Sequence, residues 1–506
     1  PHDWVVELPF AREASHSHGY KTVGWKYPET SIGWYRKTFR LPESDRGRHV
    51  RLQFDGIFRN AQVWVNGIIV GHEPSGYTSH DYDITPYLLY GEGKDALNLV
   101  CVRVDASLEE GWFYEGAGIY RHTWMEKMNP LHVATDGTFV HSTFNSDYTQ
   151  ATVTIDTDVT NEVTVPGGST AGSSITLRHT LIDAEGKAVA ATTATITPLR
   201  PAETGTTTAT LTLSTPNLWS IDTPYLYNIK TEVIADGRTV DTYTTRTGLR
   251  EIRMDKDHGL FLNGKHVKLK GVNNHQDHAG VGSAIHDALQ RYRIERLKWM
   301  GCNAYRASHN PMTREALEAC DELGMLVIAE NRLLGVNPFE MHVAENMIRR
   351  DRNHPSIFLW SIGNEEWGLE WDDRSIDIGR QMSAMCHLLD PTRPTVAASA
   401  SGPKIVIGTD VAGYNYILQN PIEEHRKNYP ERLALGSEET SGCGTRGVYF
   451  TDPTGGRMPA LNREADKDGA MNRIERGWKF YAERDYLMGL FYGTGFDYRG
   501  ESNPLS

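Results

Sequence analysis

Three features are scarce in this sequence, cysteine, long apolar runs and positive charge, and each shortage argues against a class of protein. Only five of the 506 residues are cysteines and none stands in a C-x-x-C pair, so the sequence predicts neither a disulfide framework nor a zinc site. No apolar stretch reaches the roughly 18–20 residues that cross a bilayer. Positive charge is also scarce, since the net charge is −13. This charge argues against nucleic acid and against an anionic membrane surface as partners.

The two ends of the chain predict its processing. The first residues, PHDWVVELPF, lack an initiator Met and the charged and apolar regions of a signal peptide, so we expect a mature or trimmed product. A secreted or periplasmic protein is the expectation, and a cytoplasmic location stays open. The other end, SNPLS, leaves no room for a closing helix after the last predicted strand, which predicts a C-terminal truncation.

Three patterns of strands follow one another in a chain that is too long for one core. From residue 1 to 130 short strands alternate with turns, and Val63 and Val65 lead into an Asn66-Gly67 hairpin turn, so we predict a β-sandwich. Residues 131–249 are rich in alternating Thr and Val and predict a second sandwich of immunoglobulin-like size. Residues 250–506 change to apolar strands that are separated by helical segments.

The third region contains eight buried-type strands, which is the number that a (β/α)8 barrel requires. Between them, residues 313–324 form a predicted helix with Leu317 on its apolar face, a Thr N-cap and a closing Gly. The predicted strands are residues 267–273, 302–308, 326–330, 357–365, 394–399, 411–416, 433–439 and 489–498.

Polar residues gather at the carboxyl ends of these strands, where a barrel builds its active site. Asn364 and Glu365 end one strand and Glu438 ends another; the separation of 438 − 365 = 73 residues, or three strands, sets the two carboxyls across the mouth. Such a pair can divide into a proton donor and an ionised nucleophile, as hydrolysis of a glycosidic bond needs. Other strand ends lead to His275, Arg306, His309, Glu330 and Tyr416.

The residues alone leave two questions open. Each glutamate has a neighbour of its own kind, Glu366 and Glu439, and alternation along a strand shows only that one of each pair faces the mouth. A lone Glu in such a loop is more often a helix cap or a solvated charge, whereas two of them among Asn, His, Arg and Tyr favour catalysis. The segment 274–278, NHQDH, offers metal-ligand types without any strong metal signature, so we expect no metal and no cofactor.

The chain resembles glycoside hydrolase family 2, the β-galactosidase and β-glucuronidase family, over essentially its whole length. The resemblance implies a jelly-roll sugar-binding sandwich, an immunoglobulin-like sandwich and a TIM barrel, in agreement with the three regions above. It rests on PHDW at the start, GWYRKTF (33–39), VWVNG, EGAGIYRHTW (115–124), GVNNHQDH (271–278), RASHNP (306–311), WSIGNE (360–365), GSEETSGCGTRGVY (436–449) and TGFDYRGE (494–501).

By this resemblance Glu365 is the general acid/base and Glu438 is the nucleophile of a retaining, two-step mechanism. The motif identifies Glu438 through Gly-Ser-Glu and through the eight-residue interval to Arg446. The resemblance also implies substrate-binding roles: Asn364 at the sugar 2-hydroxyl, His309 and His275 at other hydroxyls, and Arg306 and Tyr416 as donors beside the nucleophile. Tyr414 competes with Tyr416 for its place.

Two departures from the family pattern bear on metal binding and specificity. Glu330 is followed by NRLL, without the Glu and His through which some members bind magnesium. Where members commonly carry Trp before Thr-Gly-Phe-Asp, this chain has Gly493. Either another aromatic residue, such as Tyr492 or Trp367, replaces that wall, or the space admits a modified galactose, for example one with an O-methyl group.

The expected activity is that of an exo-acting β-galactosidase with a carbohydrate substrate. β-Glucuronidase and β-mannosidase are the alternatives within the family, and the former is disfavoured because no Asn-x-Lys follows Glu365. A non-catalytic carbohydrate-binding protein is the alternative from another class. Family members often associate, so the resemblance leaves a homo-oligomer open.

Overall fold

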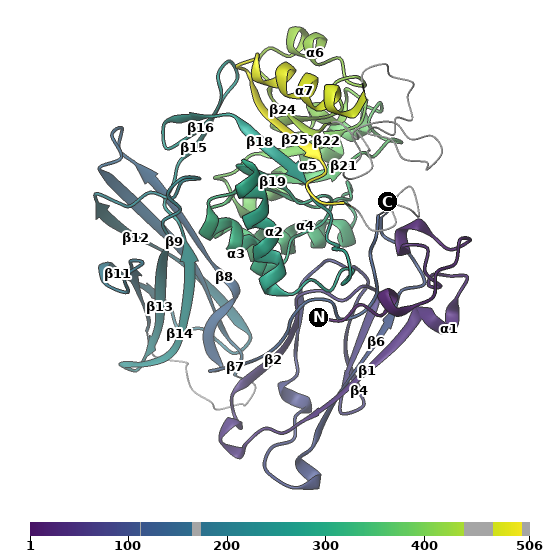
Figure 1. Cartoon of the computed structure of the whole chain (residues 1–506). Coiled ribbons are helices and arrows are strands. Elements are labelled where there is room, and N and C mark those ends of the chain that lie inside the picture. Colours follow the sequence, from purple (N-terminus) through teal and green to yellow (C-terminus); the bar gives the residue numbers. More distant parts are fainter. Residues whose placement is uncertain (112, 164–173, 440–468, 498–506) are drawn as a thin grey trace.

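The chain folds into two β-sandwiches and a closed barrel, as the three strand patterns predict (Figure 1). The computed structural model describes residues 1–111, 113–163, 174–439 and 469–497. Both sandwiches are bonded to the barrel. Arg121 of the N-terminal sandwich donates to the carbonyl of Pro311 at 2.6 Å. The indole of Trp219, in the second sandwich, donates to the carbonyl of Asp321 at 2.7 Å.

The N-terminal jelly-roll sandwich packs a four-stranded sheet on a three-stranded one. Val63 and Val65 lie in the buried core between the sheets, as does Val102 from a neighbouring strand. The first sheet consists of β1 (Ile32–Phe39), β6 (Asn98–Asp105), β3 (Ala61–Val65) and β4 (Ile68–Glu73), and the second of β5 (His80–Asp83), β2 (His49–Phe54) and β7 (Thr123–Met128).

The predicted hairpin turn joins β3 to β4. Asn66 and Gly67 have φ angles of 51° and 85°, and two positive φ values in succession are typical of a type I′ turn. Glycine adopts this conformation without steric penalty, so the Asn-Gly pair determines the register of the hairpin.

The second, immunoglobulin-like sandwich consists of longer antiparallel strands. Buried and exposed residues alternate along them, and every second residue over most of β12 is exposed, which explains the Thr-rich sequence. One sheet consists of β11 (Ala188–Ile196), β10 (Ile175–Ile182), β13 (Tyr227–Ala235) and β14 (Arg238–Thr247), and the other of β12 (Glu203–Ser214), β9 (Gln150–Asn161) and β8 (Leu131–Phe144).

All eight predicted barrel strands are present, and each pairs in parallel with its neighbours until the last strand meets the first. A small sheet of β15 (Ile252–Asp255), β16 (Gly259–Leu262) and β17 (Lys265–Val267) precedes them. The barrel strands are β18 (Leu269–Asn273), β19 (Ala304–Arg306), β20 (Leu326–Glu330), β21 (Ile357–Asn364), β22 (Thr395–Ser399), β23 (Val411–Asn415), β24 (Leu433–Glu439) and β25 (Leu487–Gly493).

An α-helix connects each barrel strand to the next, as predicted, except at one connection. Between β22 and β23 the chain forms only the short 3-10 helix η6 (Ile405–Ile407), because the connection is brief and contains Gly and Pro. The predicted caps of α3 are confirmed: Thr313 accepts from the backbone of Ala316, and Gly324 is left-handed. The α-helices are α1 (Pro28–Ser31), α2 (Asp287–Met300), α3 (Arg314–Leu323), α4 (Pro338–Asp351), α5 (Arg374–Leu389), α6 (Ile422–Asn428) and α7 (Gly469–Ala482).

The remaining 3-10 helices all lie in the N-terminal part of the chain. None of them is longer than four residues; two precede the first strand and three connect strands as turns. They are η1 (Trp4–Glu7), η2 (His16–His18), η3 (Glu43–Asp45), η4 (Thr85–Tyr87) and η5 (Lys94–Ala96).

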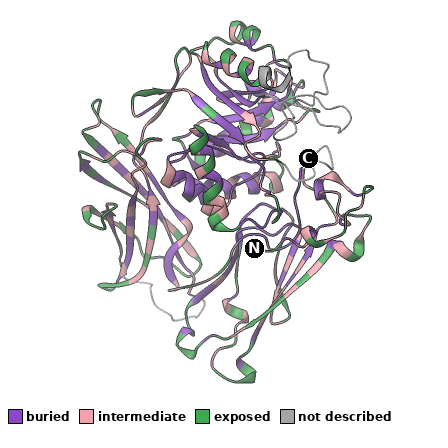
Figure 2. Ribbon diagram, viewed as in Figure 1, coloured by how far each residue is buried: buried purple, intermediate pink, exposed green. Residues whose placement is uncertain are grey.

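The interior of the barrel changes from apolar to polar along its axis. The barrel strands are the most continuously buried part of the molecule in Figure 2. Ile328 and Leu435 belong to one apolar cluster, and Glu330 and Ser437 lie two residues further along the same strands. Because side chains two residues apart share a face, the polar layer continues the apolar core at the carboxyl ends.

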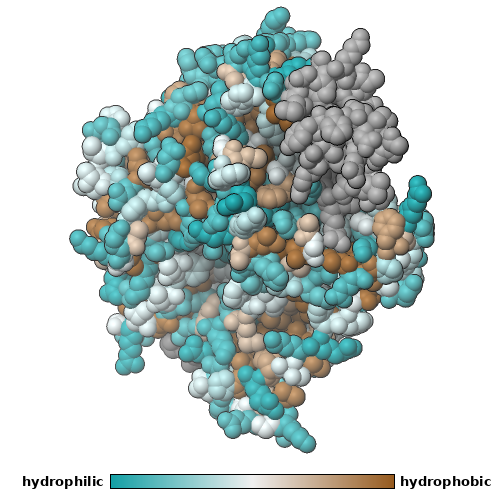
Figure 3. All heavy atoms as spheres, in the orientation of Figure 1, coloured by the Kyte–Doolittle hydropathy of each residue, from teal (hydrophilic) through white to brown (hydrophobic). Residues whose placement is uncertain are grey.

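The outer surface is mixed in character. On the face that Figure 3 shows, hydrophobic side chains are scattered among hydrophilic ones. None of the helices in the described ranges is long and apolar enough to cross a membrane.

Candidate active site

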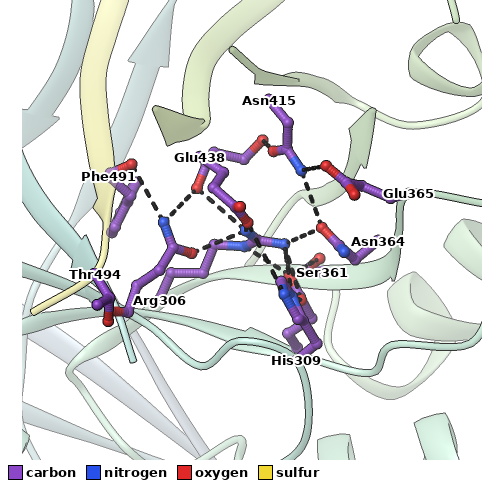
Figure 4. A network of polar contacts seen from close by, with 12 residues as sticks. Arg306, His309, Ser361, Asn364, Glu365, Asn415, Glu438, Phe491 and Thr494 are labelled. Atoms are coloured by element: carbon purple, nitrogen blue, oxygen red, sulfur yellow. Dashed lines mark hydrogen bonds and ion pairs between the residues drawn. The ribbon is translucent and has the colours of Figure 1, made fainter. Parts of the chain in front are cut away.

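Six barrel strands each end in a polar side chain that takes part in one hydrogen-bonded network (Figure 4). The positions are the last or penultimate residue of each strand, so the side chains meet at the carboxyl edge of the barrel. The residues are Asn273 from β18, Arg306 from β19, Glu330 from β20, Asn364 from β21, Asn415 from β23 and Glu438 from β24.

Arg306 is the centre of this network and is fully buried. Its Nη2 donates to Glu330 at 2.9 Å and to Oδ1 of Asn364 at 2.8 Å, and its Nη1 lies 3.2 Å from Oε2 of Glu438. Burial opposes its charge, but the carboxylates of Glu330 and Glu438 outweigh burial and raise the pKa of Arg306. The guanidinium therefore stays charged and holds two carboxylates and an amide in fixed positions.

His309 presents a hydrogen-bond acceptor beside Glu438. Burial, with Arg306 nearby, lowers the pKa of His309 well below its usual range, so the ring is neutral. Its Nδ1 lies 2.7 Å from Oε1 of Glu330 and 3.3 Å from Nη2 of Arg306; an ionised carboxylate can only accept, so the shorter contact assigns the proton to Nδ1. The Nε2 atom, 3.9 Å from Oε2 of Glu438, then keeps a lone pair that can accept a hydroxyl proton.

Glu365 follows β21 directly and turns into the mouth through an unusual backbone conformation. Its φ is 51°, and Tyr416 shares the left-handed region with a φ of 64°; among the described non-glycine residues beyond residue 263, these two alone do so. Such conformations persist where the surroundings impose them, often at functional sites. Asn415 holds the side chain that this backbone conformation directs, because its Nδ2 donates to Oε1 of Glu365 at 2.9 Å.

The two glutamates have different surroundings. Burial and, after it, the charge of Glu438 raise the pKa of Glu365 to about 7, against the lowering effect of the Asn415 hydrogen bond. Glu438 instead accepts hydrogen bonds from donors: the hydroxyl of Tyr416 on Oε1 and the guanidinium of Arg306 on Oε2. One carboxyl can therefore hold a proton near neutral pH, while the other lies among hydrogen-bond donors.

Asn364 offers an unused donor at the same place. Its Oδ1 accepts from Arg306 and from Asn415, whereas its buried Nδ2 has no hydrogen-bond partner within the described part of the chain. A buried amide donor without a partner is unfavourable, so a ligand hydroxyl that fills the mouth would satisfy it.

The remaining predicted residues have distinct places. His275 lies beside His309, with ring centroids 5.4 Å apart, and burial lowers its pKa well below the usual range. Of the two tyrosines, Tyr416 contacts Glu438, whereas the hydroxyl of Tyr414 lies 3.0 Å from Nδ1 of His425, on α6 outside the barrel. Arg446 and the predicted strand end at Tyr498 lie outside the described residues.

The neighbours within each doublet face elsewhere. Burial raises the pKa of Glu366, and the charge of Arg332, which lies near it, opposes that rise. Glu439 accepts from the backbone nitrogen of Ile417 at 2.9 Å. The structure thus brings Glu365 and Glu438 into one network and gives their neighbours other partners.

Sequence reasoning missed four members of the network: Asn273, Ser361, Asn415 and Ser437. Asn273 donates to the carbonyl of Ser437, and Ser437 donates to Oδ1 of Asn415 at 2.6 Å. Their signal was weak, because Asn and Ser are common residues, but each stands on a barrel strand at or near its carboxyl end. Glu330 was noted as a strand end without a role, and it is the carboxylate that Arg306 and His309 share.

The described residues contain one cluster with metal-binding geometry, and it shares no residue with this network. The ligand atoms of His122, Asp287 and Glu315 all lie within 4.8 Å of one another. Asp287 and Glu315 belong to the first turns of α2 and α3, and His122 comes from the N-terminal sandwich, so the cluster bridges two domains. The absence of a metal at Glu365 and Glu438 stays a prediction.

Models of known families match the chain in three consecutive stretches. Residues 26–129 match the sugar binding domain of glycosyl hydrolases family 2, residues 131–250 match a model described as glycosyl hydrolases family 2, and residues 252–429 match its TIM barrel domain. The three stretches together take in more than half of the chain.

Curated and solved proteins give the same result. The β-galactosidase BoGH2A of Bacteroides ovatus is 34% identical, and the match takes in 100% of this chain and 64% of that protein. A putative β-glucuronidase of Formosa agariphila is 30% identical and matches 99% of this chain and 49% of its own length. A solved glycosyl hydrolase family 2 member from Bacteroides cellulosilyticus has a TM-score of 0.84 at 32% identity, over 99% of this chain and 61% of that one. The chain thus spans less than two thirds of the length of each of these proteins.

Proposed function

The chain belongs to glycoside hydrolase family 2, and from that premise we propose that it is an exo-acting retaining β-glycosidase that releases terminal β-D-galactose. One observation carries the proposal: Glu365, whose pKa is raised to about 7, and Glu438, which Arg306 and Tyr416 hold by hydrogen bonds, belong to one network in the barrel mouth. A double displacement at a glycosidic carbon needs a carboxyl that donates a proton and a second one that attacks the carbon.

The reaction proceeds in two balanced steps. Glu438 attacks the anomeric carbon while Glu365 gives its proton to the departing oxygen, so the glycosidic bond breaks and a glycosyl ester of Glu438 forms. Glu365, now ionised, removes a proton from water, which attacks the same carbon and releases Glu438. Two inversions at one carbon retain its configuration.

The network also supports binding of a sugar in that position. Nδ2 of Asn364 supplies a donor and Nε2 of His309 supplies an acceptor, and hydroxyl groups serve as both. Tyr416 and Arg306 hold Glu438 from the sides, which leaves its carboxylate ordered before the substrate arrives.

Two observations favour galactose over glucuronic acid. The first curated relative described above is named a β-galactosidase, and the stretch from Glu365 to Ser506 contains no Asn-x-Lys, the carboxylate clamp that the family resemblance associates with glucuronidases. β-Glucuronidase is the second candidate, because a relative that matches 99% of this chain carries that name in putative form.

The space at Gly493 supports a substituted galactose as the natural substrate. The three heavy atoms nearest to a Cβ at this position would all belong to Glu438, at 3.5 to 3.9 Å, so a side chain there would start directly beside the nucleophile. Neither proposed replacement is suited to that role: the hydroxyl of Tyr492 donates to the backbone of Ile474, and Trp367 is 70% exposed. An O-methyl group on the terminal galactose would occupy this space.

A panel of 4-nitrophenyl β-glycosides tests the proposal. We expect the protein to hydrolyse the galactoside faster than the glucuronide and mannoside, with no measurable turnover by Glu438→Gln. Proton NMR of the sugar first released should show the β anomer before mutarotation. Faster release from the glucuronide would favour the second candidate, and first release of the α anomer would contradict the mechanism. Binding without turnover of any of the glycosides would indicate a carbohydrate-binding protein.

A further inference from the structure

A phenylalanine of the N-terminal sandwich packs inside the barrel mouth. Phe113 lies in the connection from β6 to β7, is only 2% exposed, and has its ring centroid 4.9 Å from that of His275 and 5.7 Å from that of His309. The two imidazoles lie 5.4 Å apart, so the three rings contact one another at steep angles. Aromatic pairs at these distances and angles are favourable contacts that also restrict rotation of each ring.

The loop that carries Phe113 is fastened to the sandwich on one side. The buried carboxyl of Glu115 accepts from the backbone nitrogens of Glu110 and Gly111 at 3.0 and 2.8 Å and from the hydroxyl of Tyr77. These bonds tie Glu115, which follows Phe113, to the backbone of residues 110 and 111, which precede it, and to Tyr77. The N-terminal domain itself therefore positions the ring of Phe113.

The other side of the loop is fastened to the barrel. Asp3 is buried and accepts from the backbone of Ala117 at 3.1 Å and from the hydroxyl of Tyr114 at 2.8 Å. The same carboxyl accepts from the backbone of Ser283, in the barrel segment that follows β18, at 3.0 Å. One carboxyl thus joins the loop of Phe113 to the segment that also carries His275.

We propose that Phe113 is a positioning residue of the active site, which fixes the imidazoles of His309 and His275 so that they meet the hydroxyls of the bound sugar. The inference rests on the proposed glycosidase function. It makes the N-terminal sandwich a part of the catalytic unit, because the ring that orients two barrel side chains comes from a different domain.

His309 needs such a support because its own hydrogen bonds hold it at one end. Nδ1 is tied to Glu330, but Nε2, which faces Oε2 of Glu438 at 3.9 Å, has only the substrate to hold it. A ring that is fixed at one atom can still rotate about that atom, and Phe113 packs against this ring at an interplanar angle of 48°. Loss of the phenyl ring would leave a cavity into which the imidazole can turn.

A double-mutant cycle between Phe113 and His309 separates positioning from general stability. We expect Phe113→Ala to lower kcat/KM on the hydrolysed glycoside by about 10²-fold, the effect of a misplacement of about 1 Å. In the background of His309→Ala the same change should lower it by less than about 3-fold, since the side chain to be positioned is gone. Phe54→Ala, which removes a buried ring from the sandwich core, is the matched control, and its effect should be the same in both backgrounds.

A second variant moves the ring without removing it. A Cβ at Gly111 would overlap the ring of Phe113, so Gly111→Ala should displace the ring and lower kcat/KM in the same direction, while the midpoint of thermal unfolding stays above that of Phe113→Ala. Should Phe113→Ala fail to fold, Gly111→Ala enters the cycle with His309→Ala in its place.

The outcomes separate this inference from the function on which it rests. If the wild type is active and the losses in kcat/KM from Phe113→Ala and His309→Ala multiply in the double variant, the positioning role is overturned. The glycosidase function then stays intact. A wild type that hydrolyses none of the glycosides would overturn the proposed function and the positioning role together. The inference is supported if the losses in kcat/KM from Phe113→Ala and His309→Ala do not multiply, while Phe54→Ala lowers kcat/KM by the same factor with and without His309→Ala.

Discussion

Arg306 contacts Glu438 through one nitrogen only, although both side chains are buried. Nη1 lies 3.2 Å from Oε2 of Glu438, whereas Nε and Nη2 both donate to Glu330, at 2.8 and 2.9 Å. A bidentate contact with Arg306 would neutralise the charge of the nucleophile, but in this structure Glu330 makes the bidentate contact instead. Glu438 is therefore held in place with its carboxylate still able to attack.

We predict that Arg306→Lys will lower kcat/KM by at least about 10²-fold, although the charge is kept. A lysine ammonium is a single point that cannot reach Glu330, Asn364 and Glu438 together, so the carboxylates lose their fixed spacing. Arg306→Gln, which also removes the charge, should lower the free energy of unfolding by about 3–5 kcal/mol, because it leaves buried carboxylates unpaired. Steady-state kinetics and denaturant unfolding measure the two effects.

The exposed residue Arg36 provides the control for these variants. Arg36→Lys and Arg36→Gln should change both quantities little, since a surface cation has weak and solvent-screened interactions. An Arg306→Lys enzyme within about 3-fold of the wild type would show that the fork geometry is unimportant.

The activity should fall as the pH rises through about 7, because Glu365 must carry its proton in the first step. Burial raises the pKa of Glu365 to about 7, so the acid form is present below that pH and is lost above it. Asn415 donates to the ionised form and lowers this pKa, so Asn415→Ala should move the alkaline limb of the kcat/KM profile to higher pH.

The matched control for this shift is Asn331→Ala, a buried asparagine whose amide donates to the carbonyl of Leu333 instead. It should leave the position of the alkaline limb unchanged, whatever it does to the rate. A limb that moves to lower pH in Asn415→Ala would contradict the assignment of Glu365 as the acid.

Glu365→Gln should lower kcat/KM by about 10²–10⁴-fold, the usual contribution of a general acid or base. Glu366→Gln should retain activity within about 5-fold, because Glu366 lies towards Arg332 and outside the network of Glu438. The two glutamates are adjacent, which makes each variant the control for the other. The loss with Glu365→Gln should be smaller for a nitrophenyl leaving group than for a sugar, since nitrophenolate departs without a proton. A larger loss of kcat/KM with Glu366→Gln than with Glu365→Gln would assign the general acid/base role to Glu366 instead.

The sequence predicted the fold through periodicity, which is a local property. Eight apolar strands with polar ends are visible along the chain, and closure into a barrel brings Asn364, Glu365 and Glu438 together without further information. The crossover through η6 was not visible, because alternation predicts a helix between strands even where Gly and Pro shorten the connection.

The parts of the site that could not be predicted depend on contacts between distant segments. Phe113 is an ordinary apolar residue in a loop of the sandwich, and its contact with His309 exists only after two domains dock. Glu330 looked like a strand end, and its role as the shared partner of Arg306 and His309 requires their side-chain directions. The pKa of Glu365 likewise depends on burial, which a sequence does not give.

Stability should depend on pH through Glu115. Burial, with Glu110 nearby, raises the pKa of Glu115 to about 8. The folded protein therefore holds a proton that the unfolded chain releases near the ordinary carboxyl pKa. The stabilisation is complete below that value and is lost as the pH rises to about 8.

Glu115→Gln should therefore flatten the fall in the free energy of unfolding between about pH 5 and about pH 8, because an amide does not titrate. Urea unfolding at several pH values measures the slope, with Glu92→Gln, at an exposed site, as the control. An unchanged slope would mean that Glu115 is ionised in the folded protein over this range.

The last prediction concerns the space at Gly493. A Cβ there would meet Cγ of Glu438 at 3.5 Å, an ordinary contact, so Gly493→Ala should leave the hydrolysis of unsubstituted galactoside within about 3-fold. Gly493→Trp would place an indole beside the nucleophile and fill the volume in which we propose that an O-methyl group binds. We therefore expect Gly493→Trp to lower kcat/KM for O-methylated nitrophenyl galactosides by at least about 10-fold relative to the unsubstituted one, because overfilling a packed site is unfavourable by about 1–3 kcal/mol. The ratio of the two kcat/KM values, measured in the wild type, Gly493→Ala and Gly493→Trp, isolates this effect from any general loss of activity. A wild type that strongly prefers the unsubstituted sugar, with a ratio that Gly493→Trp does not change, would show that the space at Gly493 serves no substituent.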